Sequence, residues 1–268
     1  HGQDKSNVKF GKVYPEDFAT KVYSIDSSAD AVIIADIGAT GFEGNFKGWF
    51  SLQFKHYKRV HILKKNGYDI ADVAIPLYDN GQGGEEKLEK LRAVTYNLEN
   101  GKVVETKLDT KSGVFKDKID KNWTVRKFTF PNIKEGSIIE YEYTVTSDFL
   151  FNLHPWEFQG KYPRLWSEYE VSIPQFFGYI FLSQGYRPFD IKTSKSRVAS
   201  FSVTFDNGTQ ASDRYDFSSN VTDHRWVMKN VAPLKEESYT STLDNHIAKI
   251  SFQLSERRDP LTPYTYMT

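Results

Sequence analysis

The sequence predicts a mainly β protein: a large antiparallel β-sandwich with a short N-terminal helix. Aromatic residues make up 15% of the chain, including 20 Phe and 16 Tyr, and such side chains suit the half-buried surface of a strand. Many short segments alternate apolar and polar residues with a period of two. Asn-Gly pairs separate several of these segments, and Asn-Gly is the preferred two-residue hairpin turn because both positions need positive φ.

The N-terminal part, residues 1–24, is predicted to be an extension with a short helix over residues 12–24. Pro15 suits the first turn of a helix, and Glu16 and Asp17 are favourable near its positive end. The opening His1, with no initiator Met before it, favours a mature start after removal of a signal peptide.

The following residues, 25–256, are predicted to form the sandwich. The apolar run "ADAVIIADIG" predicts a buried strand that ends at Gly38. Hairpins are predicted at Asn66-Gly67, Asn100-Gly101 and Asn207-Gly208.

Two later segments alternate clearly. "WTVRKFTF" predicts one strand, and "GSIIEYEYTVTS" predicts a longer one with Ile139, Tyr141, Tyr143 and Val145 on a single face. Further strands are expected near residues 169–173, 179–183, 199–205, 215–217, 225–228 and 247–254. Helical periodicity is nearly absent outside the start and residues 85–90.

The domain limits follow from these segments. If the sandwich consists of two lobes, the break is expected near residues 147–163. Residues 257–268 contain two prolines and few apolar residues, which predicts a linker toward a C-terminal domain absent from this chain.

The segment "FNLHPWEFQGKYPRLWSEYEVSIP" concentrates aromatic residues among three prolines. It has two interpretations: a folded corner that closes the sandwich, which the prolines favour, or a ligand-binding platform. Trp156, Trp166 and Tyr162 are the candidate ligand contacts. We expect Trp156 and Trp166 to be mostly buried.

Alternation in "WSEYEVSIP" places Tyr169, Val171 and Ile173 toward the core. Trp166 then lies on the opposite face of the strand, where Phe158 and Tyr162 are predicted to cover it.

Composition excludes several classes of function. Lys plus Arg and Asp plus Glu both number 35, so the chain has no electrostatic signature of nucleic-acid or anionic-membrane binding. No apolar run approaches the ~20 residues that span a bilayer. The absence of cysteine excludes disulfides, thiolate metal sites and a cysteine nucleophile in this chain.

Motifs for catalysis or cofactors are also lacking, and no catalytic, cofactor-binding or metal-binding residue is predicted. The glycine-rich "NGQGGEE" lacks the Gly-Lys-Ser/Thr ending of a phosphate-binding loop, and neither Gly-x-Ser-x-Gly nor His-Glu-x-x-His occurs. His56 and His61 are five residues apart on one predicted strand, so they should face opposite sides and share no metal. A pair of carboxylates for glycoside hydrolysis stays open, because 35 acidic residues always offer pairs.

Five segments together carry a family resemblance: "HILKKNGYDIADVAIPLY", "AVTYNLENGKVVETKL", "FTFPNIKEGSIIEYEYTVTS", "PWEFQGKYPRLWSEYEVSIP" and "VAPLKEESYTSTLDNHIAKISFQLSE". They resemble the domain of unknown function that precedes transglutaminase-like, papain-like domains in secreted or periplasmic bacterial proteins. The resemblance covers about residues 31–256. It implies a β-sandwich accessory domain and export from the cytoplasm, with the catalytic Cys, His and Asp in the following domain.

Two functions are therefore considered. The first is a non-catalytic accessory or interaction domain, whose partner is a C-terminal transglutaminase-like or protease-like domain and whose ligand is a peptide or glycan. The alternative is a carbohydrate-binding module that uses exposed aromatic residues.

Overall fold

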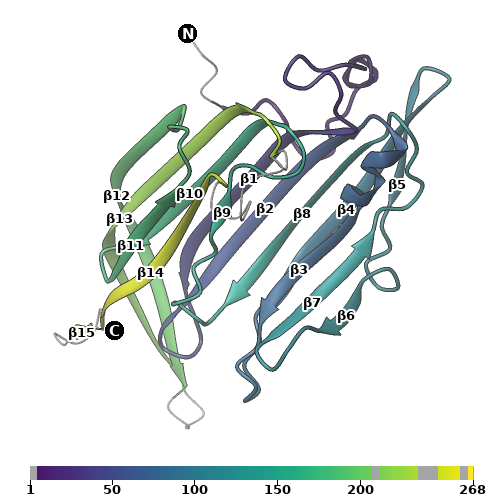
Figure 1. The fold of residues 1–268 in the computed structure, drawn as a ribbon. Coiled ribbons are helices and arrows are strands. Elements are labelled where there is room, and N and C mark those ends of the chain that lie inside the picture. Colours follow the sequence, from purple (N-terminus) through teal and green to yellow (C-terminus); the bar gives the residue numbers. More distant parts are fainter. Residues whose placement is uncertain (1–4, 207–211, 235–246, 260–264, 268) are drawn as a thin grey trace.

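The protein is a two-layer β structure (Figure 1). The computed structural model describes residues 5–206, 212–234, 247–259 and 265–267. An eight-stranded sheet forms one layer, and two smaller sheets lie side by side over one of its faces. We call this the inner face of the large sheet, and the opposite one its outer face. The mainly β prediction is confirmed.

The large sheet has the spatial order β12 (Ile191–Asp206), β13 (Ser212–Val231), β10 (Arg164–Pro174), β1 (Ala31–Gly44), β2 (Phe50–Ile62), β8 (Ile138–Ser147), β4 (Lys87–Glu99) and β5 (Lys102–Lys107). One small sheet consists of β11 (Phe177–Gln184), β14 (Lys249–Arg258) and β15 (Thr265–Met267), with β9 (Trp156–Glu157) also paired to β14. The other has the order β3 (Asp72–Tyr78), β7 (Trp123–Thr129) and β6 (Phe115–Lys118). Two short 3₁₀ helices are η1 (Pro15–Phe18) and η2 (Lys65–Ala71).

The large sheet is mixed rather than purely antiparallel. β1 and β10 pair in parallel, with Asp36 opposite Ser167, whereas the other neighbours in this sheet are antiparallel. The parallel pair arises because β10 follows a long crossover from β8 and adds beside the first strand rather than the preceding one.

The main core lies between the layers, and it is filled by the side chains that alternation places on the inward face of each strand. Ile139, Tyr141, Tyr143 and Val145 of β8 all join this core, as the sequence predicts. Phe50, Leu52 and Phe54 do the same from β2. Strands that expose only one apolar face must pack that face against a second layer, which here is the pair of small sheets.

A β-bulge changes the orientation of β1. The register against β2 shifts between Ile33 and Ala35, so one residue of β1 has no partner. Ile33 packs into the main core, but Ala35 belongs to a separate cluster on the outer face. The bulge therefore turns Asp36 toward the inner face.

The two predicted helical segments are shorter than expected or absent. Within residues 12–24 only η1 is helical, because β-branched Thr20 and Val22 follow it and an isolated short helix is marginal in water. Residues 85–90 are not helical, since β4 begins at Lys87 and pairs with β8.

The three Asn-Gly pairs have different outcomes. Asn100 and Gly101 form the predicted hairpin turn, with φ of 50° and 76°. The prediction at Asn66-Gly67 is wrong, because this pair lies in η2 and connects strands of different layers. Gly67 is needed there for close packing: a Cβ would lie 2.5 Å from the carbonyl oxygen of Asp30. Asn207-Gly208 lies outside the described residues, although β12 and β13 pair on either side of it.

The connection from β8 to β10 passes between the two small sheets. Phe149 and Phe151 pack on Tyr78 of β3, and Trp156 then pairs with Ile250 of β14. At the end of the chain, residues 257–268 include the last residues of β14 as well as β15.

Candidate functional site

A cleft of about 410 Å³ opens where the two small sheets separate over the large one. Its floor comes from β1, β2 and β8, and its walls come from β3, β7 and the β8–β10 connection. The lining residues are Asp36, Phe54, His56, Lys58, Pro76, Trp123, Tyr143, Asn152, His154, Pro155, Trp156, Glu157 and Arg164. Cavities of ~300–1,000 Å³ with a few convergent polar groups are the usual form of ligand sites.

The floor contains an unusual group of buried charges. His56 and Lys58 continue the inward alternation of Phe54 along β2, and the β1 bulge brings Asp36 opposite them. Asp36 Oδ1 lies 2.7 Å from His56 Nε2, while its Oδ2 lies 3.1 Å from Lys58 Nζ and 2.9 Å from Arg164 Nη1. We call Asp36, His56, Lys58 and Arg164 the Asp36 cluster.

The hydrogen bonds of His56 define its tautomer. Because Asp36 accepts at Nε2, that nitrogen carries the proton, and Nδ1 then accepts from the Tyr143 hydroxyl at 3.0 Å. Burial lowers the pKa of His56, although the hydrogen bond to Asp36 opposes this. The ring is therefore a neutral connector between a carboxylate and a phenol.

The carboxylate of Asp36 is held in its charged form. Burial alone would raise its pKa, but the charges of Lys58 and Arg164 and the hydrogen bond from His56 lower the pKa well below its ordinary value. Burial lowers the pKa of Lys58, and the charge of Asp36 opposes that effect. The cluster thus combines one carboxylate with two cations in a poorly hydrated site.

An Asp–His–hydroxyl arrangement invites comparison with a nucleophilic triad. Here the hydroxyl belongs to Tyr143, and burial raises the pKa of this phenol well above its ordinary value. A phenol of that kind is not ionised near neutral pH and is a poor nucleophile. The cluster offers electrostatic and hydrogen-bonding contacts for a ligand rather than an activated nucleophile.

Trp156 forms the wall opposite β3 and is fixed from several sides. Its ring stacks on Tyr169 at 5.2 Å, and its Nε1 donates to Ser167 Oγ at 3.2 Å. Gly38 makes room for it, because a Cβ there would lie 2.4 Å from the indole ring. His154, on the same segment, stacks on Phe54 at 4.3 Å. This wall of the cleft is therefore preorganised.

Aromatic rings also cluster around Tyr78 at the β3 end of the cleft. Tyr78 packs edge-on against Trp123 at 79°, Phe149 at 76° and Phe151 at 89°. Phe151 is 55% exposed, so part of this cluster faces solvent.

The three candidate ligand contacts lie in three different places. Trp156 lines the cleft, Trp166 belongs to an apolar cluster on the outer face, and the Tyr162 hydroxyl donates to Asp69 at η2. The burial predicted for Trp156 and Trp166 is confirmed, with exposed fractions of 5% and 6%.

The cover predicted for Trp166 is wrong. Phe158 and Tyr162 belong to the main core on the inner side, whereas Val8 of the N-terminal segment packs against the cluster of Trp166. The N-terminal segment follows the outer face of the large sheet, where Val8 packs on the cluster of Trp166 and Phe10 packs on Tyr57.

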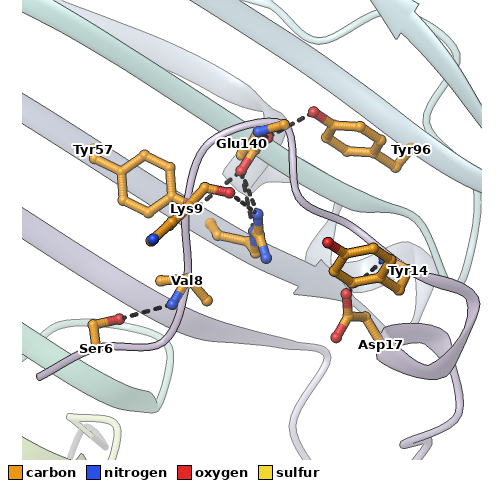
Figure 2. A network of polar contacts seen from close by, with 10 residues as sticks. Ser6, Val8, Lys9, Tyr14, Asp17, Tyr57, Tyr96 and Glu140 are labelled. Carbon is orange, nitrogen blue, oxygen red and sulfur yellow. Dashed lines mark hydrogen bonds and ion pairs between the residues drawn. The ribbon is translucent and has the colours of Figure 1, made fainter.

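That outer face carries a second polar network (Figure 2). Buried Glu140 accepts from Tyr96 at 2.6 Å and Tyr57 at 2.9 Å, pairs with Arg59 at 2.8 Å and accepts from the backbone N–H of Gly11 at 2.6 Å. Arg59 also donates to the Lys9 carbonyl. These bonds attach the N-terminal segment to the sheet, and because Glu140 is fully enclosed they indicate a structural role.

His56 and His61 lie on opposite faces, as predicted: His56 contacts Asp36 on the inner face, and His61 bonds Tyr23 of the N-terminal segment.

Among the described residues, no group of three or more His, Asp or Glu is arranged to hold a metal ion. In the same part of the chain, no helix has the length and hydropathy needed to cross a membrane.

Comparison with known proteins gives two findings. The family described as a domain of unknown function with a solved structure, DUF3857, matches residues 50–235. A crystal structure of a "putative protease" from Parabacteroides distasonis has a similar fold, with a TM-score of 0.56 and 10% sequence identity. That similarity covers 85% of this chain and 41% of the other, so this chain spans about two-fifths of that protein. No curated protein matches the sequence.

Proposed function

This chain belongs to the DUF3857 family, and we propose that it is a non-catalytic accessory domain of a larger exported protein. The observation that carries the proposal is the cleft with the Asp36 cluster, which provides binding groups without an activated nucleophile. Its role would be to hold or position a substrate for a catalytic domain.

The accompanying domain is proposed to be transglutaminase-like or protease-like. The resemblance of the five sequence segments to domains that precede such enzymes supports this. The size of the Parabacteroides distasonis protein, of which this fold covers 41%, is consistent with a second domain beside it. The same resemblance supports location in the periplasm or at the cell surface.

The gene provides the first test. Reading the coding sequence beyond Thr268 should reveal a papain-like domain with Cys, His and Asp, and a signal peptide should precede His1. A stop codon directly after Thr268 would contradict the accessory role.

A second test concerns the chain itself. The purified chain should hydrolyse neither casein nor a γ-glutamyl donor substrate above the rate of a buffer blank. Activity that disappears in His56→Phe but persists in His224→Phe, on β13 and outside the lining of the cleft, would assign catalysis to the cleft and refute the proposal.

The carbohydrate-binding alternative is not supported by its own candidate residues. Trp156, Trp166 and Tyr162 are all buried, and they lie in separate places rather than forming one platform.

A further inference from the structure

Lys58 is the cation that the floor of the cleft presents to a ligand. Its ammonium has three N–H donors, and Asp36 accepts from it at 3.1 Å. The side chain of Lys58 is 19% exposed, whereas that of Asp36 is only 3% exposed. A molecule entering the cleft therefore meets the ammonium group before the carboxylate that balances it.

The carboxylate on the floor of the cleft is already engaged. Both oxygens of Asp36 have partners, and the Glu157 carbonyl accepts from Arg164. The Glu157 carboxylate lies at the rim, half-exposed and 3.5 Å from Lys249.

Hydrogen-bond donors in the cleft, in contrast, outnumber the acceptors that they can reach. Among the described residues, Arg164 Nε is a buried donor without a hydrogen-bond partner. The residue Arg164 is itself only 8% exposed. Buried donors without acceptors are unfavourable, so a ligand that brings acceptor oxygens would relieve this imbalance.

The walls of the cleft indicate the chemistry of the rest of the ligand. Trp156, Trp123 and the rings of Pro76 and Pro155 surround the cleft with apolar surface. Trp123, whose ring packs edge-on against Tyr78, and Trp156 supply the aromatic part of this surface. Apolar surface of this kind suits an aliphatic or aromatic side chain.

We propose that the cleft binds a carboxylate attached to an apolar or aromatic body, with Lys58 holding the carboxylate and the wall of Trp123 and Trp156 holding the body. The C-terminus of a peptide and an acidic side chain next to an apolar residue both have this chemistry. This inference rests on the proposed function, because it names the ligand class of the same cleft. The absence of a catalytic domain beyond Thr268 would refute the accessory role, whereas equal binding of a carboxylic acid and its amide would refute only the ligand class.

The test is a matched pair of probes titrated into the full 268-residue chain by calorimetry. N-acetylphenylalanine should bind at least tenfold more tightly than N-acetylphenylalaninamide, which lacks the charge. N-acetylglutamylphenylalaninamide carries its only carboxylate on a side chain next to an apolar residue. Binding of this probe as tight as that of N-acetylphenylalanine would assign the site to an acidic side chain, and weaker binding would assign it to a peptide C-terminus. Lys58→Met should remove the preference for the acid, and Lys55→Met, an exposed lysine nearby on the same strand, should keep it.

A second readout does not depend on any variant. In the wild-type chain, the acid should shift the indole N–H resonances of Trp123 and Trp156 and leave that of Trp226 unchanged. Equal binding of acid and amide, no binding of either, or shifts confined to Trp226 would each overturn the proposal.

Discussion

At the scale of single residues, Gly38 decides how close Trp156 can approach β1. A methyl group at this position would lie 2.4 Å from the indole ring, which is also stacked on Tyr169 and cannot move freely. We predict that Gly38→Ala lowers the free energy of unfolding by about 1–3 kcal/mol, as overpacked cores do. Urea unfolding measures this. Gly41→Ala on the same strand, with nothing within 4 Å of the new methyl, is the matched control; an equal loss there would refute the packing explanation.

His61 should make the stability depend on pH. Burial, aided by the positive charge of Lys21, lowers the pKa of His61 to about 4. Because an unfolded histidine has a pKa near 6.5, the unfolded chain binds the proton more readily between these values. The contribution of neutral His61 to the free energy of unfolding is therefore complete above about pH 6.5. It is lost as the pH falls toward 4, and the loss is about 3 kcal/mol at most.

The measurement is urea unfolding at pH 7, 5.5 and 4.5. His61→Phe should flatten the dependence on pH, although other lowered histidine pKa values leave part of it. Tyr23→Phe removes the hydrogen-bond partner but keeps the imidazole, so it should retain the steep dependence. Identical slopes for wild type and His61→Phe would show that this residue is not the source.

The residues of the site differ in how far the sequence reveals them. Phe50, Leu52 and Phe54 alternate along one strand, and the same alternation continues through His56 and Lys58. Alternation alone therefore places two ionisable side chains on an otherwise apolar face, and ionisable groups in such a position indicate a site. Asp36 could not be assigned in this way, because the bulge in β1 reverses the parity that the residues before it establish. Arg164 carries no local signal, since only the parallel pairing of β10 brings it to Asp36.

At the scale of elements, the N-terminal segment is part of the folded domain although it contributes almost no regular structure. Phe10 lies 4.1 Å from the guanidinium carbon of Arg92 and packs edge-on against Tyr57. We predict that Phe10→Ala lowers the free energy of unfolding by about 1–2 kcal/mol, since a half-buried ring and a cation–π contact are lost. Amide hydrogen exchange of residues 8–14 should become faster. Phe46→Ala, at an 83% exposed ring, is the control and should change neither quantity.

An Asn-Gly hairpin turn can be predicted from the sequence only where tertiary packing does not require the glycine for another reason. Asn100-Gly101 lies between two strands that pair with each other, and local preference decides the turn. Gly67 has the same local sequence, but tertiary packing against Asp30 uses its missing side chain instead. The strand that follows Asn66-Gly67, β3, therefore belongs to another layer, which no short window of sequence could indicate.

At the scale of the whole molecule, the position of the cleft follows from the division of the second layer. Alternation predicts the strands and their buried faces, but strand order is a non-local property. The parallel pairing of β1 with β10 and the separation of the small sheets both depend on long crossovers. The β8–β10 connection passes between the small sheets, so the aromatic corner that the sequence emphasises becomes a wall of the site.

The central claim is that Lys58 serves ligand binding rather than stability. Burying an ion pair is often no better for stability than a neutral replacement, whereas removing one partner of the pair leaves a buried charge and is strongly unfavourable. Asn at position 36 can keep its oxygen toward Arg164, in place of Oδ2, and turn its amide NH2 toward His56 Nε2. The neutral ring accepts there in its other tautomer, so the charge of Asp36 is removed while both sides keep a hydrogen bond.

A double-mutant cycle on Asp36 and Lys58, followed by urea unfolding, tests this claim most directly. Asp36→Asn alone should lower the free energy of unfolding by about 3 kcal/mol, because Lys58 and Arg164 lose their counter-charge. The double variant Asp36→Asn/Lys58→Met should regain part of this loss, since only Arg164 then lacks a counter-charge, while its preference for N-acetylphenylalanine over the amide disappears. A double variant at least as unstable as Asp36→Asn alone, with that preference intact, would contradict the claim, because Lys58 would then contribute to stability and not to ligand binding.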